Sequence, residues 1–131
     1  MKAENLMIGD WVLDGNQIAQ VVLLTCDGII GTTFNESSNI EVVEPIPLTT
    51  EILEKNSWEE CNWDTDDDVQ YGYDYGLFYV TWWRNVKLLS CYFEDKNAGL
   101  SYEMISEMPI KYVHQLQHAL RLCGIDKEIE L

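Results

Sequence analysis

The sequence predicts an α+β fold: a small N-terminal SH3-like curled β-sheet, a short helix, an antiparallel β-meander and a C-terminal amphipathic helix packed on the sheet. Three observations support this class. Hydrophobic residues make up 47% of the 131 residues, which is enough for a core. Short runs of β-branched and aromatic residues alternate with turn-forming residues along most of the chain. Only near the C-terminus do apolar residues recur at the spacing of a helix.

The length of the chain suits one compact domain over residues 1–131, since such a chain buries roughly two-thirds of its unfolded surface. The change in pattern around Pro45 suggests a subdivision within this domain. Residues 1–45 then form the small barrel-like part, and residues 46–131 form the short helix, the β-meander and the C-terminal helix.

The N-terminal part is expected to contain short strands joined by tight turns. Strands are predicted at 11–13, 17–25, 29–33 and 40–43. Turns are predicted at Asp14-Gly15-Asn16 and Cys26-Asp27-Gly28, because Gly and Asn readily adopt the positive φ angles of hairpin turns. Strands this closely spaced favour a small SH3-like barrel.

A short helix is predicted at 48–55, with Thr49 or Thr50 as its N-cap and an acidic residue in the first turn, where the helix dipole favours negative charge. Residues 59–76 are predicted to form an acidic, aromatic loop. A hairpin follows, with strands at 77–83 and 86–93 around Arg84-Asn85, and a third strand is predicted near 100–105.

Two more patterns complete the predicted fold. On the first hairpin strand, alternation places Phe78, Val80 and Trp82 on one face and Leu77, Tyr79 and Trp83 on the other, so both faces are expected to be largely covered. The final helix is predicted to run from Pro109 in its first turn to Cys123, with Gly124 as its stop. Its apolar stripe, which should pack on the aromatic sheet, comprises Val113, Leu116, Leu120 and Cys123, broadened by Tyr112 and Ala119.

The charge of the chain is strongly negative and concentrated in its middle. The formal net charge is −15, and residues 36–75 contain twelve acidic residues and one basic residue. Direct, nonspecific binding to nucleic acid and binding to anionic membranes are therefore not expected, because both need a basic face. The N-terminal residues lack the apolar run of a signal peptide and no stretch has the length of a transmembrane helix, so we expect a cytoplasmic protein.

Three segments resemble a known group of proteins. They are Leu6-Met7-Ile8-Gly9-Asp10-Trp11-Val12, Ile46-Pro47-Leu48-Thr49 and Ile110-Lys111-Tyr112-Val113-His114-Gln115-Leu116-Gln117. Together they are similar to a widespread group of small uncharacterised proteins from Bacteroidetes phages and prophages. This resemblance implies a phage origin, the cytosol of a host cell and a shared scaffold. It supplies no activity and no site residues, so the acidic middle is where features particular to this protein are expected.

Metal, cofactor and catalytic sites are not predicted. The run from Asp64 to Asp68 has the carboxylate spacing of an EF-hand loop, but Val69 replaces the required Gly and Tyr75 takes the place of the final Glu. His114 and His118 share one helix face, although no third ligand can be named, and we expect both on the exposed side of the helix.

The cysteines and the absence of catalytic motifs argue against an enzyme. Cys26, Cys61, Cys91 and Cys123 form no Cys-x-x-Cys pair, so they are expected to be reduced and mostly buried. The sequence contains no nucleophile motif such as Gly-x-Ser-x-Gly and no glycine-rich phosphate loop.

The leading hypothesis is a non-enzymatic acidic interaction module of phage origin that binds a basic host protein. One such partner is a host defence nuclease, which an anti-CRISPR-like inhibitor would block by occupying its basic nucleic-acid-binding groove. Carboxylates would replace phosphates and aromatic rings would replace stacked bases. The residues assigned to partner binding are Trp58, Glu59, Glu60, Trp63, Asp64, Asp66, Asp67, Asp68, Tyr71, Tyr73 and Tyr75. The alternative is a protein that sequesters a small ligand or nucleotide with its aromatic cluster.

Overall fold

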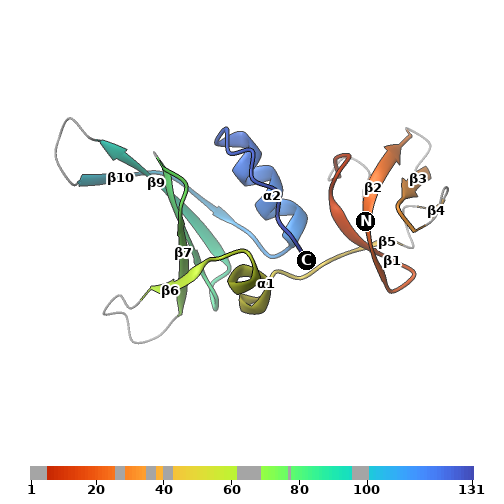
Figure 1. Ribbon diagram of the computed structural model, residues 1–131, viewed down its shortest axis with the longest axis horizontal. Helices are drawn as coiled ribbons and strands as arrows, with labels where there is room; N and C mark the ends of the chain where they lie inside the picture. Colours follow the sequence, from red (N-terminus) through yellow and green to blue (C-terminus); the bar gives the residue numbers. More distant parts are fainter. Residues whose placement is uncertain are drawn as a thin grey trace. The chain divides into compact units, whose positions relative to one another are not determined.

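The computed structural model describes residues 6–25, 29–34, 38–39, 43–61, 69–76, 78–95 and 101–131. It confirms the α+β class, with two antiparallel sheets and two helices (Figure 1). The chain forms two compact units. Unit 1 comprises Met1–Pro47 and Tyr112–Gly124, and unit 2 comprises Leu48–Lys111 and Ile125–Leu131.

Unit 1 contains a five-stranded sheet with the strand order β4-β3-β2-β1-β5 (Figure 1). Its strands are β1 (Trp11–Asp14), β2 (Gln17–Leu24), β3 (Ile29–Thr32), β4 (Ser38–Asn39) and β5 (Val43–Pro45). The predicted turn between β1 and β2 is confirmed, because Asp14 pairs with Gln17 and the φ angles of Gly15 and Asn16 are 58° and 69°. The predicted turn at 26–28 lies outside the described residues.

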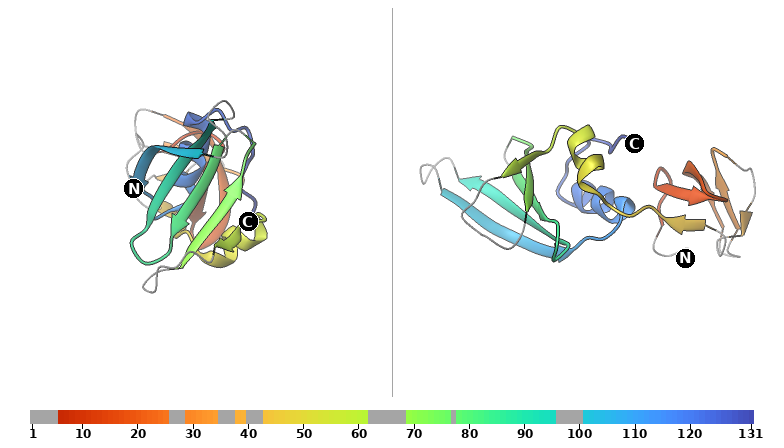
Figure 2. Two further views of the ribbon diagram at one scale, coloured as in Figure 1. Left: turned by 90° about the vertical axis from the view of Figure 1, so that its left-hand side faces the viewer. Right: turned by 90° about the horizontal axis from the view of Figure 1, so that it is seen from below.

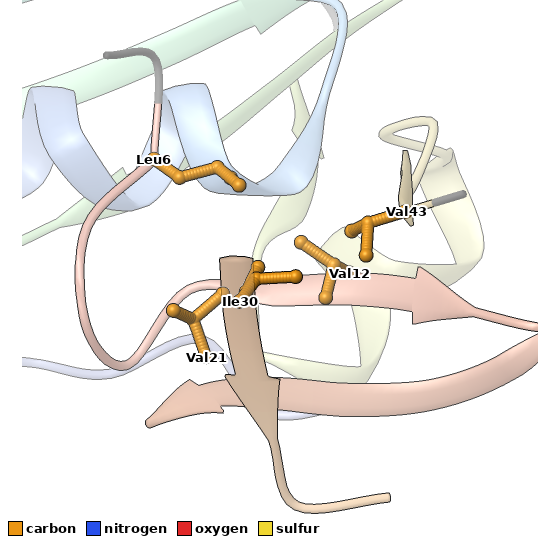
Figure 3. Packing of buried hydrophobic residues seen from close by; sticks show 5 residues of the cluster. All are labelled: Leu6, Val12, Val21, Ile30 and Val43. Carbon is orange, nitrogen blue, oxygen red and sulfur yellow. The ribbon is translucent and has the colours of Figure 1, made fainter. Parts of the chain in front are cut away.

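The core of this sheet is a cluster of aliphatic side chains. Leu6, Val12, Val21, Ile30 and Val43 are all at most 5% exposed and come from the segment before β1 and from β1, β2, β3 and β5 (Figure 3). Residues from four strands therefore meet on one face, because every second side chain of a strand points to the same side of the sheet. The SH3-like closure of this sheet remains a prediction.

The C-terminal helix, α2 (Val113–Leu122), belongs to unit 1 and begins later than predicted. Pro109 is not in its first turn but is the last residue of β10, where it pairs with Leu88. A proline is tolerated there because β10 is an edge strand. The N-terminus of α2 is instead held by the amide of Tyr112, which donates to Gln115 Oε1 at 3.1 Å. The predicted stop is confirmed, since Gly124 adopts a φ of +76° directly after the helix.

The apolar stripe of α2 is confirmed at Val113, Leu116, Ala119 and Leu120, which are buried. The helix belongs to the same compact unit as the N-terminal sheet, and its packing on the aromatic sheet stays a prediction. The amide of Val113 donates to the carbonyl oxygen of Ile46 at 2.9 Å, so the start of α2 is joined to the segment after β5. Neither helix in the described part of the chain is long and apolar enough to cross a membrane.

Unit 2 consists of a short helix and a meander sheet (Figure 2). Helix α1 (Thr50–Lys55) confirms the predicted N-cap, because Thr49 Oγ1 accepts the amide hydrogen of Ile52 at 3.3 Å. The strand order is β10-β9-β8-β7-β6, and every pair is antiparallel. The strands are β6 (Glu59–Cys61), β7 (Gln70–Asp74), β8 (Phe78–Trp83), β9 (Leu88–Asp95) and β10 (Ser101–Pro109).

The prediction that residues 59–76 form a loop is wrong at both ends of that segment, which contain β6 and β7. β7 lies between β6 and β8, so the pairing of Tyr71 with Trp82 and of Tyr73 with Val80 holds it in the sheet. Tyrosine favours strands, but the glycines and acidic residues of this segment obscured that preference. Residues 62–68, 77 and 96–100, which carry parts of other predicted turns and strands, lie outside the described residues.

The two faces of the unit 2 sheet differ in character. One face carries the buried residues Tyr71, Val80, Trp82, Leu89 and Cys91. α1 approaches this face, since Tyr71 donates its phenolic hydrogen to Glu54 Oε1 at 3.0 Å. By strand alternation, the opposite face carries Glu59, Cys61, Gly72, Asp74 and Tyr79.

Candidate functional site

The partner-binding residues expected from the sequence are divided among three environments. Trp58 and Tyr71 are 2% and 6% exposed, so they belong to the core of unit 2. Glu59 and Glu60 are exposed on β6, and Tyr73 and Tyr75 are half-buried. The remaining expected residues, Trp63, Asp64, Asp66, Asp67 and Asp68, lie outside the described residues.

The interpretation of Tyr71, Tyr73 and Tyr75 as an exposed edge is wrong, because β7 is an interior strand and Tyr71 faces the core. Burial, reinforced by the hydrogen bond to Glu54, raises the pKa of the Tyr71 phenol. Burial also raises the pKa of Tyr75, to about 12. Tyr71 therefore stabilises the fold, whereas Tyr73 in β7 and Tyr75 directly after it are half-buried.

A pocket of about 290 Å³ lies beside β6, β7 and β8. Its lining residues are Ser57, Glu59, Glu60, Cys61, Gly72, Tyr73, Asp74 and Tyr79. Three of them carry carboxylates, all three of these residues are exposed, and no lysine or arginine belongs to this lining set. We call these lining residues the acidic pocket.

Gly72 shapes the floor of the acidic pocket. Added to Gly72, a Cβ atom would lie 2.5 Å from the Tyr79 hydroxyl oxygen and 2.9 Å from Cys61 Sγ. The phenol of Tyr79 therefore passes over the backbone of Gly72 and reaches Cys61 Sγ, which lies 3.1 Å from the hydroxyl oxygen. A glycine inside a strand often marks such a close approach, but Gly72 was not singled out from the sequence.

Asp74 is held at the mouth of the turn that follows β7. Its Oδ1 accepts the amide hydrogen of Gly76 at 2.9 Å, and Gly76 adopts a φ of +85°. The amide of Tyr75 donates to the carbonyl oxygen of Phe78 at 2.8 Å and closes the turn. Alternation along β7 then places the Asp74 carboxylate on the same face as Gly72.

An aromatic cluster borders the acidic pocket at Tyr73. The ring centroids of Tyr73 and Tyr75 are 4.4 Å apart, and each lies 6.3 Å from the centroid of Trp58. Lys127, from the C-terminal segment, places its Nζ 4.0 Å from the Tyr73 ring centroid and donates a hydrogen bond to the Tyr73 hydroxyl at 2.7 Å. Asp74, Tyr79 and Lys127 were not among the site residues predicted from the sequence.

Unit 1 contains a separate polar cluster around Asp10, which is 0% exposed. His118 Nε2 lies 2.7 Å and 2.9 Å from its two carboxylate oxygens, and the amide of Met7 donates to Oδ2 at 2.7 Å. Arg121 Nη1 lies 3.7 Å from Oδ1. These contacts join α2 to the segment that precedes β1, so the cluster has a structural role.

The expectation that both histidines lie on an exposed helix face is wrong. His114 is 4% exposed, its ring stacks on that of Tyr112 at a centroid distance of 5.8 Å, and His118 binds Asp10. Burial lowers the pKa of His114. In the described part of the chain, no group of three or more His, Cys, Asp and Glu side chains is arranged to hold a metal ion.

No family model, curated protein or solved structure matches this chain. The phage resemblance therefore stays a prediction, and the function has to be argued from the site itself. What the acidic pocket can do chemically follows from its lining: exposed carboxylates and phenol rings attract a cation, and they repel phosphate.

Proposed function

We propose that this protein is a non-enzymatic interaction module whose acidic pocket binds a cationic side chain of a basic protein partner. The observation that carries the proposal is the grouping of Glu59, Glu60 and Asp74 around one pocket that also contains Tyr73 and Tyr79. Four of the acids assigned earlier to the same role, Asp64 and Asp66 to Asp68, immediately precede β7 in the sequence and add to the negative charge of this segment.

The energetics favour a partner that is drawn in by charge. A single pair of opposite charges 4 Å apart is worth about 1 kcal/mol in water and about 4 kcal/mol near a protein surface. Three exposed carboxylates therefore create a local negative potential that speeds the approach of a basic protein and disfavours acidic ones. Tyrosine rings add rigid contact area with little loss of side-chain entropy.

The class of partner we propose is a host protein with a basic nucleic-acid-binding groove, such as a defence nuclease. The resemblance of residues 6–12, 46–49 and 110–117 to phage proteins supports this choice of a host protein as the partner. In such a groove the carboxylates of the acidic pocket would replace phosphates, and Tyr73 and Tyr79 would replace stacked bases.

A catalytic role is disfavoured by the same lining residues. The lining includes one thiol, that of Cys61, and no histidine, lysine or arginine that could activate it as a nucleophile. Sequestration of a nucleotide is disfavoured because the lining offers no cation to the phosphates. A small organic cation fits the charge better, and thermal shift with such cations and with nucleotides compares the two classes.

The test compares two triple variants with the same change in net charge. The pocket variant is Glu59→Gln, Glu60→Gln and Asp74→Asn. The control variant is Glu44→Gln, Glu107→Gln and Asp126→Asn, at exposed positions outside the acidic pocket. Each protein is titrated with a short oligolysine peptide and with a basic nucleic-acid-binding protein at several salt concentrations.

We expect the pocket variant to bind both cationic probes at least about tenfold more weakly than the control variant, since each lost charge-assisted contact is worth roughly 0.5 to 1 kcal/mol at an exposed site. We also expect nucleic acid to compete with the wild-type protein for the basic protein. Equal affinity of the two variants would show that only the bulk charge matters, and the proposal would then be wrong.

A further inference from the structure

The C-terminal segment places a cation on the aromatic rings beside the acidic pocket. The ammonium nitrogen of Lys127 lies 4.0 Å from the ring centroid of Tyr73 and 5.9 Å from that of Tyr75. The same nitrogen donates to the Tyr73 hydroxyl at 2.7 Å. Two rings and one hydroxyl therefore surround one ammonium group, which is an arrangement that recognises cations.

The rings that hold this ammonium are fixed by packing. Trp58 is 2% exposed and lies 6.3 Å from both tyrosine rings, so it supports them from the core. The strand β7 holds the backbone of Tyr73, which pairs with Val80. Because the rings are held by the fold, the site does not need Lys127 to keep its shape, and another cation would find the same arrangement.

Lys127 is attached more weakly than the rings. It is exposed and lies in the segment Ile125–Leu131, which contains no helix or strand. The segment is anchored on either side of the lysine by the buried side chains Ile125 and Ile129. The cation–π contact and the hydrogen bond of an exposed lysine are both weak in water, so the side chain can leave the rings while these anchors stay in place.

We propose that Tyr73 and Tyr75 form a binding subsite for a lysine side chain of the protein partner, and that Lys127 occupies this subsite until the partner replaces it. The inference rests on the proposed function, because Tyr73 also lines the acidic pocket. A partner with two neighbouring cationic side chains would place one on the rings and the other among the carboxylates. Lys127 then lowers the affinity for every partner that has to displace it.

Lysine fits this subsite better than arginine does. The ammonium of Lys127 combines the ring contact with a hydrogen bond to the Tyr73 hydroxyl, which a compact point donor satisfies. The planar guanidinium of arginine needs paired acceptors to use its fork of donors, and one hydroxyl does not supply them.

The test uses Lys127→Ala and a matched control, Arg84→Ala, in the full-length protein. Both variants remove one positive charge from an exposed side chain of unit 2. Arg84 lies at the other end of β7 from Tyr75, because its amide donates to the carbonyl oxygen of Val69. The probes are a short oligolysine peptide, the same peptide with acetylated lysines, and an oligoarginine peptide, all at one ionic strength.

Binding is measured by calorimetry, and the ring environments are followed by fluorine NMR of 3-fluorotyrosine at Tyr73 and Tyr75. We expect Lys127→Ala to bind oligolysine about fivefold more tightly than Arg84→Ala does, the factor that corresponds to about 1 kcal/mol for an exposed cation–π contact. The Tyr73 and Tyr75 signals should move with oligolysine, move less with oligoarginine and stay in place with the acetylated peptide.

Equal affinities of Lys127→Ala and Arg84→Ala for oligolysine, or tyrosine signals that do not respond, would overturn this inference. The triple carboxylate variant keeps this outcome separate from the proposed function. If that variant binds oligolysine more weakly than its control while Lys127→Ala and Arg84→Ala bind it with equal affinity, the acidic pocket binds cations and the tyrosine subsite does not. If the triple variant binds like its control, the proposed function itself is wrong.

Discussion

The two units of this protein use carboxylates in opposite ways. In unit 1, Asp10 and Asp14 are 0% and 2% exposed, and each accepts hydrogen bonds from neighbouring segments. In unit 2, the carboxylates of Glu59, Glu60 and Asp74 are exposed around the acidic pocket. The acids behind the net charge of −15 therefore include two populations, one that stabilises the fold and one that is accessible to a partner.

Burial explains why the first population must be paired. An ionised carboxylate removed from water loses several kcal/mol of hydration unless hydrogen bonds and opposite charges replace it. Asp10 has such replacements in Met7, His118 and Arg121, and Asp14 accepts the hydroxyl hydrogen of Thr32 at 2.8 Å. An exposed carboxylate keeps its water and has no such requirement, so its partner can arrive from another molecule.

The largest expected effect comes from the buried acid. We expect Asp10→Asn to lower the free energy of unfolding by about 3 kcal/mol, because it removes the buried charge that accepts the Met7 amide hydrogen and faces His118 and Arg121. Urea unfolding followed by circular dichroism measures the change. Glu44→Gln, an exposed acid of the same unit, is the control and should stay within about 0.5 kcal/mol of the wild type. If the two variants were equally stable, buried and exposed acids would not differ in what they contribute to the stability of this protein.

A smaller effect is expected at the floor of the acidic pocket. Gly72→Ala should lower the free energy of unfolding by about 1 to 3 kcal/mol, because the new methyl group collides with the Tyr79 hydroxyl and Cys61 Sγ. Tyr79→Leu removes the colliding ring end, so the double variant should lose less stability than the sum of the two single variants. If the stability losses of Gly72→Ala and Tyr79→Leu, measured by thermal unfolding, added up to that of the double variant, the close approach of Tyr79 to Gly72 would be contradicted.

The pH dependence of unit 1 tests a further consequence of burial. The pKa of His114 is lowered below its usual 6.5, chiefly by burial; Asp10 opposes this with a smaller effect that raises the pKa, and His118 adds a smaller effect that lowers it. The unfolded chain therefore binds a proton that the folded chain resists, so stability is complete above about pH 6.5 and declines as the pH falls through the lowered pKa.

The measurement is the free energy of unfolding between pH 7.5 and pH 5 for the wild type and His114→Gln. We expect the variant to lose part of this decline, because glutamine does not titrate. Identical pH profiles would mean that His114 binds its proton equally well in the folded and unfolded chain.

The smallest effect on stability is expected at the exposed acids. The variant with Glu59→Gln, Glu60→Gln and Asp74→Asn should unfold within about 0.5 kcal/mol of the wild type, or be slightly more stable because like charges no longer repel. Thermal unfolding measures the change in stability, and its comparison at low and high salt measures the part that comes from repulsion between like charges. A loss comparable to that of Asp10→Asn would mean that these carboxylates are structural, and the contrast between the units would then disappear.

Local patterns allowed much of the fold to be predicted. The turn at Asp14-Gly15-Asn16, the N-cap of Thr49 and the stop at Gly124 are set by residues that are neighbours in the sequence, so their short-range chemistry determines them. The same holds for the hairpin of β8 and β9, although its turn occupies residues 84–87 and Lys87 adopts a φ of 57°. The errors at 59–76 and at Pro109 arose where pairing with a distant strand overrode local preference.

The site could be predicted only in outline. Glu59, Glu60 and Tyr73 were expected from the acidic and aromatic composition around them, and the structure places them together in one pocket. Trp58 and Tyr71 were assigned to the same surface because composition does not distinguish a buried ring from an exposed one. Lys127 lies 54 positions from Tyr73 and had no signal that linked it to the site.

The sequence by itself determined the amount of negative charge, its concentration in the middle of the chain, the α+β class and the local turns and caps. These depend on composition and on residues close in sequence. Only the tertiary structure decided which acids are buried and which line a pocket, since Asp10 finds His118 across 108 positions. Contacts between residues so far apart in the sequence depend on the topology of the strands, and the packing of the whole unit determines that topology.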